Sequence, residues 1–198
     1  MGSESEFKEK RSHSFIIVCV YIFFGSCELV MILPNLHLYL QTLGLTSEAC
    51  FGLILSAYSV SSAISGLLGG CLVDLTPCHI KSVLIVSIMF RILGNFQYSL
   101  GLSVWNVFFA RVITGLSGVA GTAVLAEFGR ITTREERTMF FSLTETAFQV
   151  GILLSPALQF LISLVNFDIF GLAINILNAP GLVMGFLWII LLLAATFA

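Results

Sequence analysis

The sequence predicts an all-α, polytopic membrane protein with six transmembrane helices. Of its 198 residues, 58% are hydrophobic and only 10% are charged, with a mean hydropathy of +1.02, whereas soluble domains carry about 25% charged residues. Polar clusters divide the chain into six apolar runs, each close to the roughly 20 residues that a helix needs to cross a bilayer. Basic residues lie before the first run and then in every second connection between runs. The composition excludes a soluble domain, a disordered chain and a nucleic-acid binder with a basic face.

The six apolar runs follow a polar N-terminal tail, residues 1–14, and together form one helical domain, residues 15–198. The predicted spans are residues 15–40, 50–73, 82–100, 104–128, 139–165 and 179–197. The first, fourth and fifth runs are long enough to tilt in a bilayer of ordinary thickness.

The basic residues predict which way the spans run. Seven of the nine lie before the first span, between the second and third, or between the fourth and fifth: Lys8, Lys10, Arg11, Lys81, Arg130, Arg134 and Arg137. The other three connections hold none. Because positive charge collects on the cytosolic side of a membrane, we expect the N-terminus in the cytosol, and six crossings return the C-terminus there.

Five ionisable residues fall inside the predicted spans: Glu28, Arg91, Arg111, Glu127 and Glu145. A charge at the bilayer centre costs at least ~2.5–3.5 kcal/mol on insertion scales, so such residues face the bundle interior and have partners. Glu28 and Arg91 each lie near the middle of a span, at similar heights, so they can form an ion pair. Such a pair either only fixes helix packing or includes a proton site at Glu28, because burial disfavours the charged form of a carboxyl group.

The remaining intramembrane polar residues extend this predicted substrate or ion pathway, which consists of Glu28, Arg91, Arg111, Glu145 and Gln149. Glu145 and Gln149 are four residues apart and share one helix face. That face either lines a polar path or makes a hydrogen bond between helices. Arg111, in the outer half of its span, either joins the path or reaches the outer interface. We expect Glu127 at the cytosolic interface.

Four short motifs in order along the chain resemble those of the major facilitator superfamily (MFS). They are Gly70-x-Leu72-x-Asp74, Arg111-x-x-x-Gly115-Leu-Ser-Gly118, the loop Thr132–Arg137, and Gly151-x-x-x-Ser155-Pro156. The basic second half of the first motif is missing, because Leu75, Pro77, Cys78 and His79 stand there instead.

The resemblance implies the six-helix N-terminal half of an MFS fold, with a 3+3 repeat. It implies a cytosolic gate at Gly70, Leu72, Asp74 and Arg137. It also implies points of helix flexing at Gly115, Gly118, Gly151, Ser155 and Pro156, for which close helix packing is the alternative.

Within that superfamily the chain looks most like the lysosomal branch linked to neuronal ceroid lipofuscinosis. The likeness rests on Gln149-Val-Gly151 through Pro156-Ala-Leu-Gln159, and on Ile174-Asn175 followed by Pro180. It implies secondary active transport of a small solute or anion across an endomembrane, and the organelle that the likeness suggests is the lysosome. A full family member has about twelve helices, so the resemblance implies a truncated form or a half that pairs with a second six-helix half or with its own copy.

Two other functions fit the same sequence. One is a non-transporting truncated isoform or interaction subunit, and the other is a channel formed by oligomerised six-helix units. No zinc, Ser/Lys, Asp/Asp or phosphate-loop motif occurs, so we expect neither an enzyme nor a bound metal or cofactor. The expected partners are the lipid bilayer and a small-molecule or ion substrate, and not nucleic acid.

Overall fold

A computed structural model describes the backbone of residues 2–75, 80–163, 167–169, 172–174 and 176–197. It describes the side chains of residues 14–71, 80–130, 132–162 and 176–197. The elements are α1 (Gly2–Thr42), α2 (Glu48–Leu75), α3 (Ile80–Leu100), α4 (Val104–Leu116), α5 (Gly118–Ile131), α6 (Arg134–Ser163), β1 (Phe167–Ile169), β2 (Leu172–Ile174) and α7 (Ala179–Phe197).

The prediction of an all-α membrane fold with six spans is confirmed. Six helical segments of the described chain are long and apolar enough to cross a membrane: Ser14–Thr42, Glu48–Cys71, Ile80–Leu100, Val104–Arg130, Arg134–Ile162 and Ala179–Phe197. Helices α4 and α5 together form the fourth of these spans.

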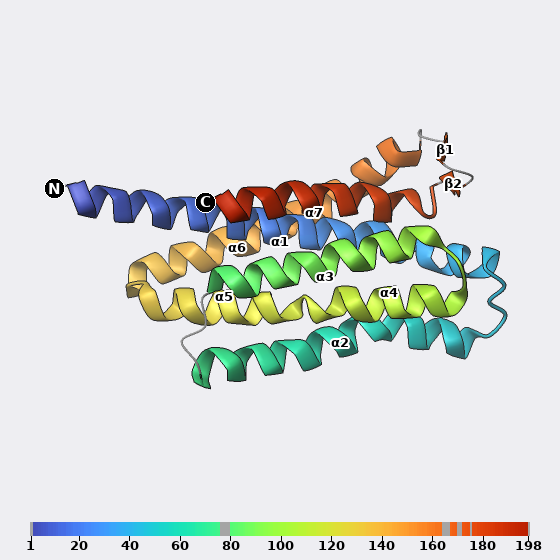
Figure 1. The fold of residues 1–198 in the computed structure, drawn as a ribbon, viewed down its shortest axis with the longest axis horizontal. Helices are drawn as coiled ribbons and strands as arrows, with labels where there is room; N and C mark the ends of the chain where they lie inside the picture. Colours follow the sequence, from blue (N-terminus) through green and yellow to red (C-terminus); the bar gives the residue numbers. More distant parts are fainter. Residues whose placement is uncertain (1, 76–79, 164–166, 170–171, 175, 198) are drawn as a thin grey trace.

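The helices run side by side, and consecutive spans point in opposite directions (Figure 1). The start of α1 and the end of α7 lie at one end of the bundle, together with the end of α2, the start of α3 and the α5–α6 connection. The basic residues in and beside these helix ends therefore share one end of the bundle. That this end faces the cytosol stays a prediction, since the structure contains no membrane.

The largest cluster of buried apolar side chains lies mainly between α1, α3 and α7. Helix α1 packs mainly on α6 and α7, α3 packs on α4 and α7, and α2 packs on α4 and α5. Helices α2 and α6 thus form the two flanks. Large apolar side chains such as Leu67 and Leu153 are exposed there, as lipid allows, because its acyl chains are as apolar as leucine.

The structure adds three features that the hydropathy pattern does not predict. Helix α1 continues back through the polar tail to Gly2. The fourth span is interrupted at Ser117, whose backbone N–H bonds to the Thr114 carbonyl three residues back, at 3.2 Å. A two-stranded antiparallel hairpin, with Phe167 opposite Ile174, lies between α6 and α7. Its strands have only three residues each, too few for an alternating pattern to stand out.

Candidate functional site

A cluster of polar and aromatic side chains occupies the middle of the bundle. We call it the central cluster, and its members are Tyr21, Glu28, Tyr58, Arg91, Ser117 and Trp188. Glu28, Ser117 and Trp188 are the middle residues of their spans, and Tyr58 and Arg91 lie within two residues of theirs. Five of the six spans therefore contribute to one layer at the depth where uncompensated charge is most costly.

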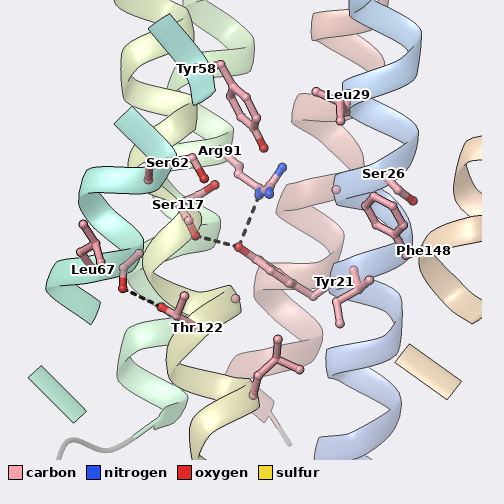
Figure 2. A pocket seen from close by; sticks show the side chains of 17 residues that line it. Tyr21, Ser26, Leu29, Tyr58, Ser62, Leu67, Arg91, Ser117, Thr122 and Phe148 are labelled. Atoms are coloured by element: carbon pink, nitrogen blue, oxygen red, sulfur yellow. Dashed lines mark hydrogen bonds between the residues drawn. The ribbon is translucent and has the colours of Figure 1, made fainter. Parts of the chain in front are cut away.

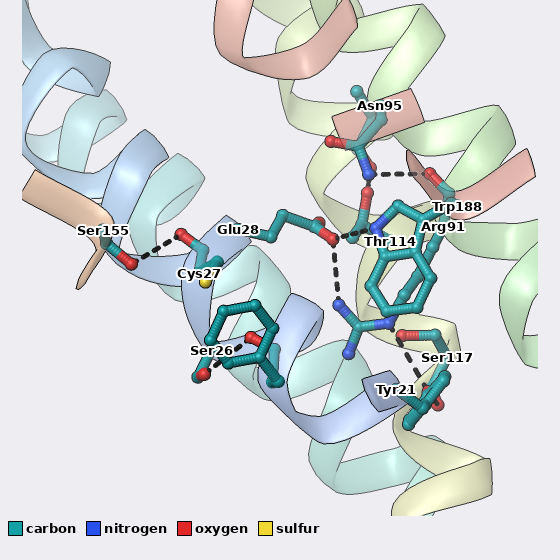
Figure 3. Close-up of polar contacts among 12 residues, drawn as sticks. Tyr21, Ser26, Cys27, Glu28, Arg91, Asn95, Thr114, Ser117, Ser155 and Trp188 are labelled. Carbon is teal, nitrogen blue, oxygen red and sulfur yellow. Dashed lines mark hydrogen bonds and ion pairs between the residues drawn. The ribbon is translucent and has the colours of Figure 1, made fainter. Parts of the chain in front are cut away.

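The cluster is built on a buried ion pair between Glu28 on α1 and Arg91 on α3 (Figure 3). Arg91 Nη1 donates to Glu28 Oε2 at 3.0 Å, and Trp188 Nε1 on α7 donates to the same oxygen at 2.7 Å. Glu28 is 1% exposed and Arg91 is 6% exposed. Since desolvation of both ions is expensive, such a pair persists only with good geometry and further hydrogen bonds.

Aromatic rings enclose the Arg91 guanidinium group. Its Cζ atom lies 4.7 Å from the Trp188 ring and 5.3 Å from the Tyr21 ring, both within cation–π range. Arg91 Nε donates to the Tyr21 hydroxyl at 3.4 Å, and this hydroxyl donates to the Ser117 carbonyl at 3.1 Å. A continuous set of contacts thus joins the ion pair to the interruption between α4 and α5.

Several buried polar atoms around the cluster have no hydrogen-bond partner within the described part of the chain. They include Glu28 Oε1, Asn95 Oδ1, Arg111 Nε and Ser117 Oγ. Buried polar atoms are nearly always paired, with protein or with water. The cluster therefore has hydrogen-bonding capacity that its own described side chains do not use.

Arg111 lies six residues before Ser117, nearer the start of the fourth span. The sequence leaves two interpretations of Arg111: a member of the polar path, or a side chain that reaches the outer interface. The second interpretation is wrong, because Arg111 is only 2% exposed. Its Cζ atom instead lies 4.7 Å from the ring of Tyr58 on α2. No carboxylate among the described residues forms an ion pair with Arg111.

A cavity of about 650 Å³ opens beside the central cluster (Figure 2). Tyr21, Tyr58, Arg91 and Ser117 line it, and Phe148 closes its α6 side. The cavity therefore gives a ligand direct access to the guanidinium group and to three of its neighbours.

A smaller cavity of about 220 Å³ adjoins the first and shares Tyr21 and Phe148 with it. Glu145 lines this smaller cavity. Gln149 donates a hydrogen bond of 2.7 Å to Glu145, and both side chains are exposed. Their bond lies within α6 rather than between helices. Their place in a substrate or ion path stays a prediction.

The glycines predicted as flexing points lie where helices approach closely. A Cβ atom on Gly115 would lie 2.6 Å from the Tyr58 carbonyl oxygen, and one on Gly118 would lie 2.8 Å from the Ser62 carbonyl oxygen. These two residues bracket the interruption at Ser117. The structure therefore gives them a packing role against α2, and flexing stays a prediction.

Helix α6 meets α1 in the same way at the predicted Gly151-x-x-x-Ser155-Pro156 motif. A Cβ atom on Gly151 would lie 2.7 Å from the Phe23 carbonyl oxygen. Ser155 Oγ contacts the carbonyl oxygens of Gly151, at 2.6 Å, and Cys27, at 3.3 Å (Figure 3). Pro156 lies inside α6, which continues past it to Ser163.

The predicted cytosolic gate is only partly described. Gly70 is half-buried, and no described atom lies within 4 Å of a Cβ built on it, while Arg137 is exposed. The side chains of Leu72 and Asp74 lie outside the described residues. Its gating role therefore stays a prediction.

Sequence reasoning missed the aromatic members of the cluster. Tyr21, Tyr58 and Trp188 lie in apolar runs, where an aromatic residue gives no sign of polar contacts. Trp188 carries the one usable signal, because tryptophan prefers the membrane interface and this residue is at the centre of its span.

Comparison with known proteins assigns the family. The sequence pattern described as "Major Facilitator Superfamily" matches residues 14–197. The tetracycline resistance protein, class H, of Pasteurella multocida is 22% identical over 147 residues, which are 73% of this chain and 36% of the relative. The tetracycline resistance protein, class C, of Escherichia coli is 25% identical over 138 residues, which are 68% of this chain and 34% of the relative.

The chain spans about a third of the length of these curated relatives. Neither relative supports the narrower likeness to the lysosomal branch, which stays a prediction. The family match extends over nearly all of the described helices. The chain belongs to the Major Facilitator Superfamily.

Proposed function

We propose that the chain is the six-helix half of a secondary active transporter that moves a small solute or anion across an endomembrane. The observation that carries the proposal is the buried Glu28–Arg91 ion pair in the middle of the bundle, whose arginine lines a 650 Å³ cavity. Intramembrane ion pairs are costly and mark substrate and ion paths. Transporters of this type bind their substrates near the bilayer midplane.

The hydrogen bonds of Glu28 suggest how an ion could be coupled to the solute. Arg91 and Trp188 both bond to Oε2, whereas Oε1 has no partner among the described residues. A proton that arrives at Oε1 neutralises the carboxylate and weakens its hold on Arg91. The guanidinium group is then available to a solute in the cavity, so a proton on Glu28 favours solute binding at Arg91.

Access to this site from alternate sides needs helices that move against one another. The interruption at Ser117 and the motif around Pro156 are the proposed flexing points, and Asp74 is the proposed cytosolic gate. The open cavity, and the length of the relatives, favour a second six-helix half or a second copy as the partner of this one. The endomembrane setting, and the lysosome in particular, rests on sequence resemblance alone.

The proposal is tested by reconstituting the chain in liposomes that contain a pH-sensitive dye. An inward or outward proton gradient is applied, and a panel of sugars, amino acids, organic anions, organic cations and tetracycline is added. We expect at least one class to drive saturable proton movement, which Glu28→Gln abolishes. Glu127→Gln is the matched control, because Glu127 is partly exposed and lies near the end of its span.

Two results would contradict the carrier assignment. Flux that rises without saturation would favour a channel of oligomerised units. No flux for any class, from protein that retains its helical content, would favour a non-transporting truncated isoform or interaction subunit.

The proposed orientation has its own test. Cysteines placed at Lys8 and Arg134, in a chain whose native cysteines are replaced, should both react with an impermeant thiol reagent from the cytosolic side. Labelling from opposite sides would refute the topology.

A further inference from the structure

The buried charges of the described spans do not balance. Arg91 and Arg111 are 6% and 2% exposed, whereas Glu28 is the one carboxylate buried to a similar degree in the described part of the bundle. One negative charge therefore stands against two positive charges. Because uncompensated charge is costly inside a membrane, the site favours a ligand that supplies the missing negative charge.

Arg91 is placed to receive such a ligand. Nη1 bonds to Glu28 and Nε bonds to Tyr21, while Nη2 makes no hydrogen bond to any described residue. Gly25 and Arg91 both line the cavity, and a Cβ atom on Gly25 would lie only 3.2 Å from Nη2. The glycine thus leaves this amino group open to the cavity, as Figure 2 shows for the guanidinium group between Tyr58 and Tyr21.

Arg111 supplies the surplus charge from behind Tyr58. Its guanidinium group stacks on that ring, and the Tyr58 side chain lines the cavity. Arg111 interacts electrostatically with both Glu28 and Arg91, so a ligand bound at Arg91 also feels its charge. A unit charge on the order of 10 Å away changes an affinity by about tenfold at an effective dielectric constant of 20.

The rest of the cavity wall indicates the body of the ligand. Leu29, Leu125 and Phe148 form apolar walls, and hydroxyl groups of Ser62 and Ser117 lie among them. Guanidinium groups recognise carboxylates and similar oxyanions through their planar set of donors. The combination suits a compact organic anion with one oxyanion group and an apolar body.

Glu145 is the carboxylate that could oppose this charge pattern. It lines the adjoining small cavity and not the one that Arg91 lines, so Glu28, which bonds directly to Arg91, stays the nearer carboxylate. Its charge excludes a polyanion more strongly than a monoanion.

We propose that the cavity binds one organic monoanion, whose oxyanion group accepts a hydrogen bond from Arg91 Nη2 and whose charge is balanced by Arg111. This inference deepens the proposed function, since it names the substrate class for the same site. Binding, however, can be measured without transport.

The test is equilibrium binding of radiolabelled benzoate to the detergent-solubilised 198-residue chain, at constant ionic strength. Unlabelled benzoate, benzyl alcohol and benzylammonium are each tested as competitors, because they share a ring and differ in charge. We expect benzoate to compete, and neither of the other two to do so at matched concentration. Arg130→Gln, a cation removed at the exposed end of the fourth span, is the matched control and should leave the affinity unchanged.

Charge-changing variants give the sharper result, because the proposal predicts changes of opposite sign in their affinity for benzoate. Arg111→Gln should weaken benzoate binding about tenfold, and Arg111→Lys should restore most of it. Glu28→Gln should strengthen binding by a similar factor, since it removes the competing carboxylate. Circular dichroism and size-exclusion chromatography identify variants that fail to fold. If Arg111→Gln is one of these, the Arg111→Lys and Glu28→Gln results decide.

Three results would overturn the inference: no benzoate binding by folded protein, equal or better competition by benzylammonium, or weaker binding in folded Glu28→Gln. Anion binding without flux would leave the inference standing and refute the transport proposal. Flux of a neutral or cationic solute without anion binding would refute the inference and leave the transport proposal standing.

Discussion

The Glu28–Arg91 pair makes a quantitative prediction about stability. In Arg91→Met, the Glu28 carboxylate stays buried with Trp188 as its only described donor, and removing one partner of a buried ion pair costs about 3–5 kcal/mol. In Glu28→Gln, the Arg91 cation stays between the rings of Tyr21 and Trp188. Cation–π contacts are worth up to about 2 kcal/mol when desolvated, so we expect a smaller loss of about 2–3 kcal/mol.

The double variant removes both charges and so avoids the cost of leaving either one unpaired. We expect its loss to be smaller than the sum of the single losses, with a coupling free energy of about 2–4 kcal/mol. The measurement is the free energy of reversible unfolding in mixed micelles. Losses that add within about 0.5 kcal/mol would refute the reasoning, because they would mean that the two side chains act independently.

The same cycle on Glu127 and Arg130 is the control. Arg130 Nη1 lies 4.0 Å from Glu127 Oε2. The two residues are three positions apart on α5, and both side chains are partly exposed. Exposed pairs of this kind are worth about 0.3–0.5 kcal/mol, so their coupling should be near the limit of detection.

Three further predictions concern the same region. Glu28→Gln should abolish the pH dependence of solute flux in liposomes between acidic and neutral buffers, and a wild-type pH profile in this variant would remove Glu28 from the coupling mechanism. Trp188→Phe should lower the free energy of unfolding by about 1.5–3 kcal/mol, since it removes a hydrogen bond to a charged group, and a loss below 0.5 kcal/mol would argue against that bond. Gly151→Ala should lower the free energy of unfolding by about 1–3 kcal/mol, because it overpacks the contact between α1 and α6. Its control is Gly121→Ala, where a Cβ meets no atom within 4 Å, and which should leave this free energy unchanged or raise it by up to about 1 kcal/mol. Equal effects of the two substitutions would show that α1 and α6 are not in close contact.

The general architecture was predictable because lipid imposes simple rules. Spans must be helical and about 20 residues long, so hydropathy alone identifies all six. The pairing of Glu28 with Arg91 was also within reach, because equal depth and opposite charge leave few alternatives inside a membrane. The structure places their charged groups 3.0 Å apart.

Other features depended on three-dimensional contacts that leave no mark in one sequence. The position of Trp188 beside Glu28 depends on the packing of α7 against α1, between residues 160 positions apart in sequence. The interruption at Ser117 is equally hidden, since glycines and serines are common in membrane helices and most do not interrupt them. Arg111 shows the limit of sequence-based prediction most clearly. Its depth in the membrane follows from its position in the span, whereas its burial against Tyr58 does not.

The spacing of the cluster along the chain has a consequence for biogenesis. Glu28 is synthesised 63 residues before Arg91 and 160 residues before Trp188. At about 5–20 residues per second, Arg91 is synthesised roughly 3–13 s after Glu28, and Trp188 about 8–32 s after it. During that interval the carboxyl group must take up a proton, or the insertion machinery must shelter the first hairpin from the lipid. Until its third span is inserted, the nascent chain therefore carries a carboxyl group in its first span without the cation that pairs with it in the finished bundle.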